Sequence, residues 1–356
     1  MKNICIFARE IEINTSLLKN PNFKDIIGEV AKHHKILITT HTNPDGDAIG
    51  SSLALFGYLK KKLHEVYVMV PDPDPSFLHW MPYHSELLIF STDKETCMKV
   101  IESAELIVSV DYNTLDRLEE ATEYVKKATG KKILIDHHTD PDKSFFRMIS
   151  DTTVSSTAEL IYDFISESGD NDLIDTDIAA CIFAGIITDT GSFSYNCNNE
   201  KTYQITSHLI SSGIDGEHIH RLVYDTYSED RLRLLGYSLS EKLVVLHESN
   251  TAYISLSKDD LQRFNHQVGD TEGVVNYGLS MDGINLAALF MERENLVKIS
   301  FRSKGNFSVN DLARKHFEGG GHNNAAGAYS YLSLDETIAK FISLLPVYHE
   351  QLKKVY

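Results

Sequence analysis

The residue types with the greatest chemical potential follow a short apolar stretch, where Asp136-His137-His138 comes directly after Ile133-Leu134-Ile135. Short runs of branched apolar residues are typical of buried parallel strands. In an open α/β sheet, ligands bind in the crevice beyond the carboxyl ends of such strands. An acid and two imidazoles at this position predict a metal site, and the plainer alternative is a helix cap followed by two surface histidines.

Two further apolar stretches end in the same residue types. Residues 35–40 run into the segment His41-Thr-Asn-Pro-Asp45-Gly-Asp47, and residues 106–110 run into Asp111. Predicted strands and helices alternate here, which favours a doubly wound, mainly parallel sheet. Because parallel strands of one sheet end at one edge, we expect these side chains to meet there.

Asp189 stands just after a predicted helix at residues 177–187, where an acid opposes the helix dipole. Gly191 suits an ordinary C-terminal helix cap, which is the structural alternative for this stretch. A bound cation would remove the conflict between the acid and the dipole. The residues that we expect to converge as metal ligands are His41, Asp45, Asp47, Asp111, His137 and Asp189.

This set of side chains limits the chemistry. Four clustered carboxylates resist ionisation in one another's presence, whereas two divalent cations balance their four charges if one carboxylate bridges the metals. Mixed imidazole and carboxylate ligands favour Mn²⁺, with Mg²⁺ as the alternative and Zn²⁺ and Fe²⁺ still open. Two such metals about 3.5–4 Å apart clamp both sides of an in-line displacement at phosphorus and generate hydroxide near neutral pH. We therefore predict a two-metal hydrolase of phosphate esters.

The composition of the chain limits which substrates it can bind and in which cellular compartment we expect it. The 356 residues carry a formal net charge of −17, with 42% hydrophobic and 24% charged residues. A protein that follows a long nucleic acid usually displays a broad basic surface, so we expect no long duplex as a partner. Four cysteines without a Cys-x-x-Cys pair indicate free thiols, and neither a membrane span nor a signal peptide is predicted. We predict a cytoplasmic protein.

The second half of the chain has a different pattern. Two predicted hairpins, at residues 242–256 and 285–301, and a helix at 309–317 favour a smaller α/β domain. Candidate anion-binding residues are Arg302, Ser303 and Lys304 at a strand end, followed later by Gly319, Gly320, Gly321 and His322. Glycine backbone allows an anion to approach closely, although a flexible helix cap is the alternative for the triplet. We expect an active site in the cleft between the two domains.

Taken in order, these motifs resemble a known family. The segments His41-x-x-x-Asp45-x-Asp47, Val110-Asp111-x-Asn113, Asp136-His137-His138 and Thr188-Asp189-x-Gly191 are similar to the four motifs of DHH phosphoesterases. Arg302-Ser-Lys-Gly305 and the stretch at 319–327 resemble the DHH-associated C-terminal domain. The length is similar to that of the nanoRNase type. The charged, helical pattern of residues 199–240 predicts a linker. We therefore expect an N-terminal extension (1–21), a catalytic metal-binding domain (22–198), this helical linker (199–240) and a substrate-binding domain (241–356).

The resemblance also implies residue roles. One Mn²⁺ would be held by His41, Asp45 and Asp111, and the other by Asp47, Asp111, His137 and Asp189. Asp136 would orient an imidazole, and His138 would face the scissile phosphate or the leaving group. Arg302 and His322 would bind the phosphate end of the substrate. Asn323 and Asn324 depart from the basic residue or proline of many relatives, which affects the substrate preference.

The function implied is hydrolysis of short single-stranded RNA of 2–5 nucleotides to mononucleotides, together with removal of the 3′-phosphate from adenosine 3′,5′-bisphosphate. Three alternatives stay open: a polyphosphate or pyrophosphate hydrolase, a phosphodiesterase of linear dinucleotides, and a catalytically idle nucleotide-binding module. Clustered acids without metals would be costly, which argues against the last. A homodimer is compatible with the sequence.

Overall fold

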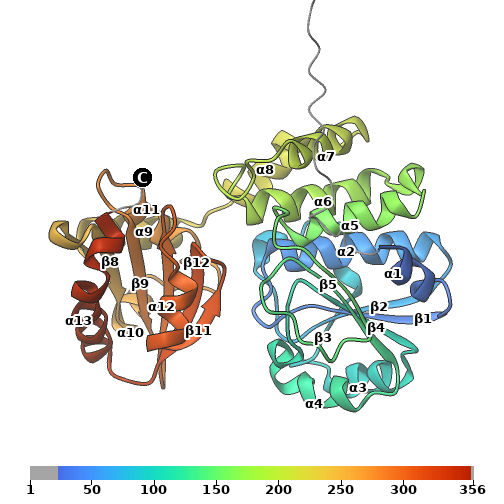
Figure 1. Ribbon diagram of the computed structural model, residues 1–356, viewed down its shortest axis with the longest axis horizontal. Coiled ribbons are helices and arrows are strands. Elements are labelled where there is room, and N and C mark those ends of the chain that lie inside the picture. The colour runs from blue at the N-terminus through green and yellow to red at the C-terminus, as the bar shows by residue number, and fades with distance from the viewer. Residues whose placement is uncertain (1–22, 354–356) are drawn as a thin grey trace, which may run out of the picture.

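The computed structural model describes residues 23–353, which fold into two α/β domains joined by a short connection (Figure 1). The predicted N-terminal extension lies outside the described residues. Among the helices between residues 23 and 353, none combines the length and the apolar character needed to cross a bilayer.

The first domain is built on a six-stranded sheet in which every neighbouring pair of strands is parallel. The strand order is β3-β2-β1-β4-β5-β6. The strands are β1 (Lys35–Thr39), β2 (Glu65–Val70), β3 (Leu87–Ile89), β4 (Leu106–Val110), β5 (Lys131–Asp136) and β6 (Arg147–Ser150). The chain starts in the middle and winds outward in both directions, which confirms the predicted doubly wound sheet.

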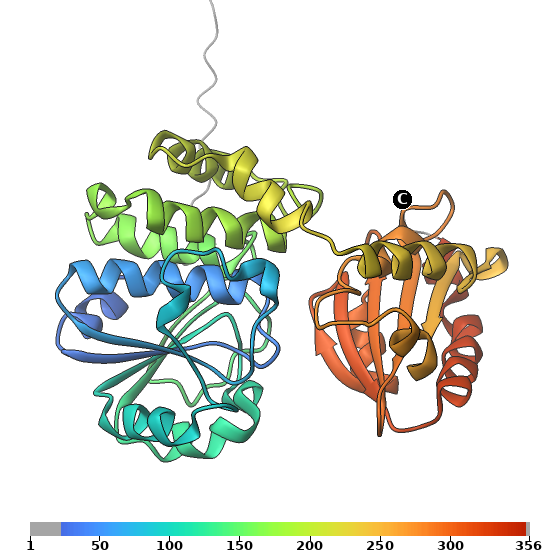
Figure 2. The same ribbon diagram turned by 180° about the vertical axis from the view of Figure 1, so that it is seen from behind.

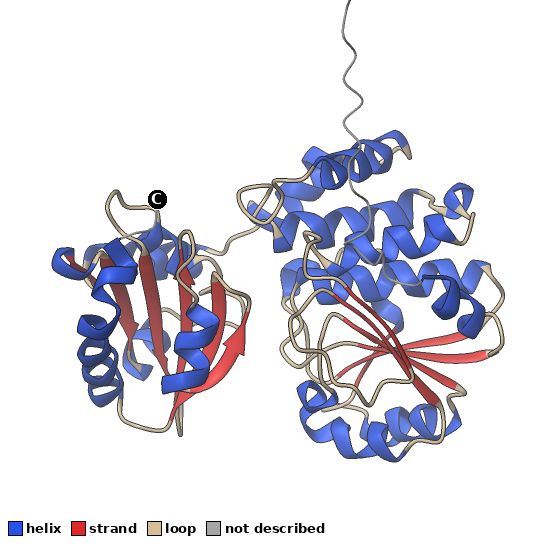
Figure 3. Ribbon diagram, in the orientation of Figure 1, coloured by secondary structure: helices blue, strands red, loops and turns tan. Residues whose placement is uncertain are grey.

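Helices cover both faces of this sheet (Figure 3). On one face lie α1 (Phe23–Val30), α2 (Gly46–Lys61), α5 (Thr157–Glu167) and α6 (Thr176–Asp189), and on the other lie α3 (Lys94–Ser103) and α4 (Thr122–Lys127). Successive side chains of a strand point to opposite faces. Ile36 and Ile38 of β1 therefore join one apolar cluster, while Leu37 joins the other. Burial on both faces explains why these strands are continuously apolar.

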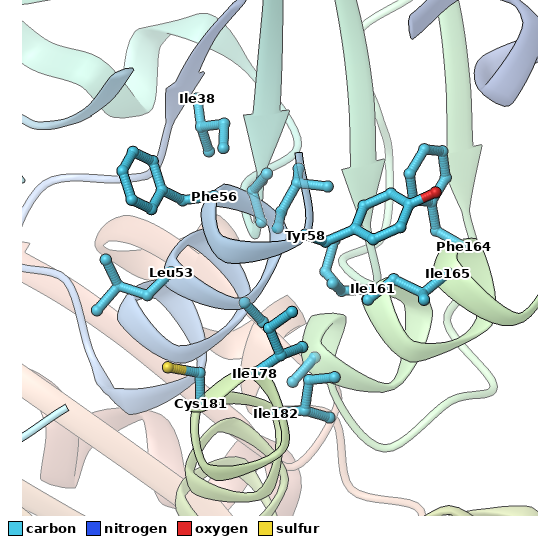
Figure 4. Packing of buried hydrophobic residues seen from close by; sticks show 14 of the residues in the cluster. Ile38, Leu53, Phe56, Tyr58, Ile161, Phe164, Ile165, Ile178, Cys181 and Ile182 are labelled. Carbon is cyan, nitrogen blue, oxygen red and sulfur yellow. The ribbon is translucent and has the colours of Figure 1, made fainter. Parts of the chain in front are cut away.

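The larger cluster packs α2 against α5 and α6 (Figure 4). Leu53 and Phe56 of α2 belong to this core together with Ile178 and Ile182 of α6. Such burial is worth about 1.5–3 kcal/mol for each large apolar side chain. The packing fixes the start of α2 relative to the end of α6, and both helix ends carry predicted metal ligands.

The predicted helical linker divides between the two domains. Helices α7 (Glu200–Ser211) and α8 (Gly216–Tyr224) pack on α6 of the first domain. Helix α9 (Glu229–Ser240) packs instead on β7, β8 and α11 of the second domain. We therefore propose residues 225–228 as the junction, the yellow connection in Figure 1.

The second domain contains a mixed six-stranded sheet with the order β11-β12-β10-β9-β8-β7. The strands are β7 (Leu243–Leu246), β8 (Thr251–Leu256), β9 (Leu286–Glu292), β10 (Val297–Ser303), β11 (Glu318–Gly321) and β12 (Ala325–Ser330). Only the β8–β9 pair is parallel, and both predicted hairpins are present.

This second sheet also has helices on both faces, as Figure 2 shows from behind. Helices α12 (Val309–His316) and α13 (Leu334–Lys353) cover one face. The other face packs against α9, α10 (Lys258–Arg263) and α11 (Val274–Leu279). Successive residues of β9 point to opposite faces of this sheet. Phe290 packs in the apolar cluster beneath α12 and α13, and Leu289 packs in the cluster beneath α9, α10 and α11.

Two local expectations were wrong. The sequence predicts a helix at about 113–128, but the structure has a 3₁₀ segment there followed by α4, because Glu119 breaks the helix with φ +45°. The sequence also predicts Asp177 as the N-cap of the helix that ends near residue 187, but the cap of α6 is Asp175, whose carboxylate accepts a hydrogen bond from the Ile178 N–H. Both residues are acids near one helix start, so composition alone did not separate them.

Candidate metal centre and interdomain cleft

The site lies where the winding direction of the first sheet reverses, between β1 and β4. His41 follows β1 by two residues, Asp111 comes directly after β4, and Asp136 ends β5. These three strands are neighbours, so their carboxyl ends deliver the side chains to one point. Ligand sites of open α/β sheets occur at this kind of reversal.

Asp111 is the centre of the cluster. Its Oδ2 lies 3.7 Å from His41 Nε2, and its Oδ1 lies 3.6 Å from His137 Nε2. His137 Nε2 also lies 3.9 Å from Asp47 Oδ2 and 3.5 Å from Asp189 Oδ2. The structure thus brings together residues that are up to 148 positions apart, as the difference between 41 and 189 shows.

Two of the groups of possible ligand atoms share Asp111. His41, Asp45 and Asp111 place their ligand atoms within 4.8 Å of one another, and so do Asp47, Asp111 and His137. A carboxylate has two oxygens, so Asp111 offers one to each group. Buried His and Asp clusters of this kind are consistent with a divalent metal site.

In Asp45 and in His41, one polar side-chain atom forms a hydrogen bond with nearby backbone, and the other is free to bind a metal. The Asp45 Oδ1 caps α2 by accepting the N–H groups of Asp47 and Ala48, both at 3.0 Å, which leaves Oδ2 available. The His41 Nδ1 donates to the Thr42 carbonyl at 2.7 Å. This bond fixes the tautomer that leaves Nε2 free to ligate a metal.

The N-terminus of α5 holds two of the acids, a contribution that the sequence interpretation missed. The Thr157 and Ala158 N–H groups donate to the Asp47 carboxylate at 2.7 and 2.9 Å. The Thr157 hydroxyl donates to Asp111 Oδ1 at 2.8 Å. Free N–H groups at a helix start bind anions. The Ser155-Ser156-Thr157 run was the available signal, since it is typical of a helix N-terminus.

Burial and mutual repulsion perturb the acids of the cluster. Burial, followed by the charges of Asp111, Asp189 and Asp45, raises the pKa of Asp47 well above its usual range. Burial likewise raises the pKa of Asp189 to about 6, although His137 opposes the shift. Asp111 is also buried, but His41, His138 and His137 lower its pKa below the usual range. The charges are therefore unbalanced, and added cations would relieve the repulsion.

Two buried carboxylate oxygens in this region have no hydrogen-bond partner among the described residues: Asp189 Oδ2 and Asp136 Oδ2. Leaving such an oxygen unpaired is costly. For Asp189, which faces His137 at the centre of the cluster, a cation is the partner that fits. The residues present thus suit a pair of divalent metals.

His138 stands at the edge of this cluster and is held by Asp136. Its Nδ1 donates to Asp136 Oδ1 at 2.7 Å. Burial disfavours the charged ring, but the Asp136 bond and the nearby acids outweigh it and raise the pKa of His138 to about 9. Asp136 therefore keeps the imidazole oriented and protonated at neutral pH.

His322 reaches this point from the second domain. Its ring lies 4.5 Å from that of His138, nearly parallel at 23°, and 4.8 Å from that of His137. Burial, together with the neighbouring His138 and His137, lowers the pKa of His322 to about 3, so the ring is neutral. The two domains therefore meet at the proposed centre.

A cavity of about 1300 Å³ lies between the domains beside this contact. Its first-domain wall includes Asp45, His137 and Asp189, and its second-domain wall includes Arg302, Ser303, Lys304 and His322. Sequence reasoning missed several further lining residues, among them Phe77, Tyr195, Tyr227, Arg231, Glu272 and Lys298. Arg231 stacks on Tyr227, four residues earlier, at 3.8 Å from the ring centroid.

The glycine triplet at 319–321 has a different role from the phosphate cradle that we expected. It forms β11, and these three residues do not line the cavity. A Cβ at Gly319 would lie 2.1 Å from the Gly327 carbonyl oxygen of β12, so a close strand pair requires glycine here. Gly321, with φ +148°, ends the strand and leads to His322. The triplet therefore positions His322.

Ser303 lines the cavity, but its hydroxyl is occupied. It donates to the Phe307 carbonyl at 2.6 Å and accepts from the Asn324 amide at 2.9 Å. Asn324 also donates to the Gly305 carbonyl at 2.9 Å. Ser303 thus fixes the loop that carries Lys304, instead of offering a free donor.

Close contact between helices sets the position of Asp47. A Cβ at Gly185 in α6 would lie 2.5 Å from the Ala158 Cβ and 2.8 Å from Asp47 Oδ1. We expect Gly185→Ala to destabilise the protein by about 1–3 kcal/mol, because overpacking outweighs the helix propensity of alanine. Urea unfolding measures this change. Gly236→Ala is the control, since nothing lies within 4 Å of that site in α9; equal effects of both changes would contradict the packing account.

Comparison with known proteins agrees with this geometry. The DHH family N-terminal domain matches residues 35–186, and the DHHA1 domain matches residues 251–345. The chain is 31% identical over 322 residues to the bifunctional oligoribonuclease and PAP phosphatase NrnA of Thermus thermophilus, covering 89% of this chain and 91% of that one. The chain belongs to the DHH phosphoesterase family. This result confirms the resemblance recognised in the sequence.

Two further relatives are similar to this chain over most of their length. The enzyme of the same name from Bacillus subtilis is 29% identical, covering 90% of this chain and 97% of that one. A solved structure of an exopolyphosphatase-related protein from Bacteroides fragilis has 41% sequence identity and a TM-score of 0.89, covering 93% of this chain and 97% of that chain. The present DHH phosphoesterase therefore shares the two-domain fold of these relatives.

Proposed function

We propose that this protein is a Mn²⁺-dependent phosphoesterase that hydrolyses short oligoribonucleotides to mononucleotides and removes the 3′-phosphate of adenosine 3′,5′-bisphosphate. The observation that carries this proposal is the buried His and Asp cluster that opens onto a cavity with cationic side chains on its opposite wall. The names of the relatives from Thermus thermophilus and Bacillus subtilis support the substrate class.

In this proposal, His41, Asp45 and Asp111 hold one cation, while Asp47, Asp111, His137 and Asp189 hold the other. The two ligand groups that share Asp111 support six of these seven placements, and the 3.5 Å distance between His137 Nε2 and Asp189 Oδ2 supports Asp189. Mixed nitrogen and oxygen donors suit Mn²⁺ better than Mg²⁺. When bound, such a pair neutralises charge developing at phosphorus and lowers the pKa of water.

The protein's own groups complete the reaction. The Asp136 carboxylate, which accepts the His138 Nδ1–H, favours the protonated form of this imidazole. Its other ring nitrogen can then donate to a phosphate oxygen or protonate the departing ribose oxygen. His322 stacks on the His138 ring and so helps to hold the imidazole in place beside the cluster. These roles are part of the proposal.

The second domain binds the rest of the substrate. Arg302 and Lys304 stand at the end of β10 and line the cavity, and the Lys304 ammonium donates to the Met281 carbonyl at 3.3 Å. A guanidinium binds a phosphate through two parallel hydrogen bonds. A phosphate held between two walls fixes the substrate length, which favours short chains over long ones.

Comparing the products formed from RNAs of graded length and from two other phosphate compounds tests the substrate class. Purified full-length protein with Mn²⁺ is given labelled RNA of graded length, adenosine 3′,5′-bisphosphate and tripolyphosphate in parallel assays. We expect the shortest RNAs and adenosine 3′,5′-bisphosphate to be turned over fastest. Faster turnover of tripolyphosphate would instead support the polyphosphatase alternative, which the name of the Bacteroides fragilis relative favours. No turnover with any divalent metal would refute both.

Removing the guanidinium should mainly weaken binding. We expect Arg302→Ala to raise KM by roughly 10–100-fold with a much smaller change in kcat, because a charge-assisted hydrogen bond contributes about 1.5–3 kcal/mol. Steady-state kinetics on a dinucleotide separates the two constants. Lys315→Ala is the control, since that exposed lysine on α12 does not line the cavity. A large fall in kcat alone would show that Arg302 acts on the reacting phosphate.

A further inference from the structure

A second group of metal-ligating side chains lies apart from the candidate centre, in the proline-rich loop that follows β2. Asp74, His79 and His84 place one ligand atom each within 4.8 Å of one another. The His84 Nε2 lies 3.0 Å from Asp74 Oδ2, and the His79 Nε2 lies 3.8 Å from Asp74 Oδ1. None of the three belongs to the groups around Asp111.

The carboxylate of this group is buried, which makes its surroundings informative. The Asp74 side chain is only 2% exposed. Within residues 23–353, the only basic side chains within ion-pair distance of it are the imidazoles of His79 and His84, and no lysine or arginine pairs with it. A buried carboxylate is costly unless a positive charge or several donors compensate it. A dication at the convergence of the three side chains would supply that charge.

The geometry of the two rings suits ligation. Their centroids are 4.5 Å apart with an interplanar angle of 38°, and both face Asp74 through Nε2. We propose that Asp74, His79 and His84 form a Zn²⁺ site that is separate from the hydrolytic centre. Two imidazoles, one carboxylate and an open fourth position make a ligand set that Zn²⁺ accepts. The His79 side chain is 52% exposed, so solvent reaches the open position.

This loop borders the cleft between the domains. Phe77, between Asp74 and His79, lines the cavity. Pro75 and Phe77 also lie next to Gly269 of the second domain, where an added Cβ would be 3.5 and 3.6 Å from their side chains. A metal that joins both ends of the loop therefore restrains the segment that presents Phe77 to the substrate. The proposal stands on these contacts and does not depend on the substrate.

Equilibrium dialysis with Zn²⁺ tests the site. The full chain carrying Asp111→Asn, which disables the shared ligand of the hydrolytic centre, is stripped with chelator and dialysed against Zn²⁺ alone. Bound metal is then counted by elemental analysis. We expect His79→Gln in this background to bind one equivalent fewer, or to bind that equivalent with at least about tenfold lower affinity. His84→Ala should have the same effect.

A control variant at another histidine and a measurement of thermal stability complement the dialysis experiment. His247→Ala removes an exposed histidine outside these groups and should leave Zn²⁺ binding unchanged. Zn²⁺ should also raise the melting temperature of the Asp111→Asn protein more than that of its His79→Gln derivative. His79 is half exposed, so its replacement does not threaten folding. Equal Zn²⁺ stoichiometry and affinity with and without His79 and His84 would overturn the proposal, and would leave Asp74–His84 as a local hydrogen bond of the loop.

Discussion

Replacing Asp111 with Asn should nearly abolish hydrolysis while the protein stays folded. Asp111 contributes to both ligand groups of the proposed centre, so its loss would take one ligand from each of the two cations. We expect kcat to fall on the order of 10³-fold or more, well beyond the roughly 10–100-fold loss that follows removal of a group that only orients a ligand. Turnover of a labelled dinucleotide with Mn²⁺ measures the effect.

The choice of substituent matters for this test. Asp111 has φ +65°, a left-handed conformation that Asn adopts readily and most other residues do not. Asparagine also keeps an oxygen for the Thr157 hydroxyl, which donates to Asp111. Asp116→Asn is the matched control, since that acid is 77% exposed and pairs with the exposed Lys126. Activity of Asp111→Asn within tenfold of the parent would remove Asp111 from the proposed centre.

Replacing Asp189 with Asn should stabilise the protein without metal and prevent its stabilisation by metal. Burial raises the pKa of Asp189 to about 6 from the ordinary value of 3.8. The folded state therefore holds the proton more tightly than the unfolded state, and the ionised carboxylate destabilises the fold above about pH 6. In chelator at pH 7–8 we expect Asp189→Asn to raise the free energy of unfolding by about 1–3 kcal/mol.

The negative charge of the Asp189 carboxylate makes the stability difference between the native protein and Asp189→Asn depend on both pH and metal. As the pH falls from about 6 to about 4, the native Asp189 takes up a proton, so the advantage of asparagine should disappear. With saturating Mn²⁺, the native protein should gain about 2.7 kcal/mol at a metal concentration 100 times the Kd, while the variant gains less. Urea unfolding in chelator and in Mn²⁺ measures both effects.

Asp177→Asn, at the exposed start of the same helix, is the control for Asp189. It should change stability by less than about 1 kcal/mol and should not alter the response to metal. If Mn²⁺ stabilised Asp189→Asn as much as the native protein, Asp189 would not be a ligand.

Much of the first domain could be predicted from the sequence because its strands are locally distinctive. The strand at residues 35–40 and the helix that follows it occupy nearly the predicted positions, since both are continuously apolar or strongly helical. The edge strands β3 and β6 were not predicted. Each has only three or four residues, and their pairing with β2 and β5 is a tertiary contact that no local pattern reports.

In the candidate site, too, the residues that follow a predictable strand could be placed from the sequence, and those placed by tertiary contacts could not. His41, Asp111 and His137 could be placed together because each follows a parallel strand, and such strands end at one edge of the sheet. Thr157 could not, since its bonds to Asp47 and Asp111 span 110 and 46 residues. The glycines of β11 were misjudged because glycine is depleted in strands, and only the approach of β12 makes them necessary.

The central claim is that the cluster around Asp111 holds two cations. The most direct test is a crystal structure of the full chain from crystals grown with Mn²⁺. Diffraction data collected at the manganese absorption edge give an anomalous difference map that locates the metal. We predict two anomalous peaks, one beside His41 and Asp45 and one beside His137 and Asp189, with Asp111 between them. No peak at Asp111, or a single peak remote from either pair of side chains, would contradict the account.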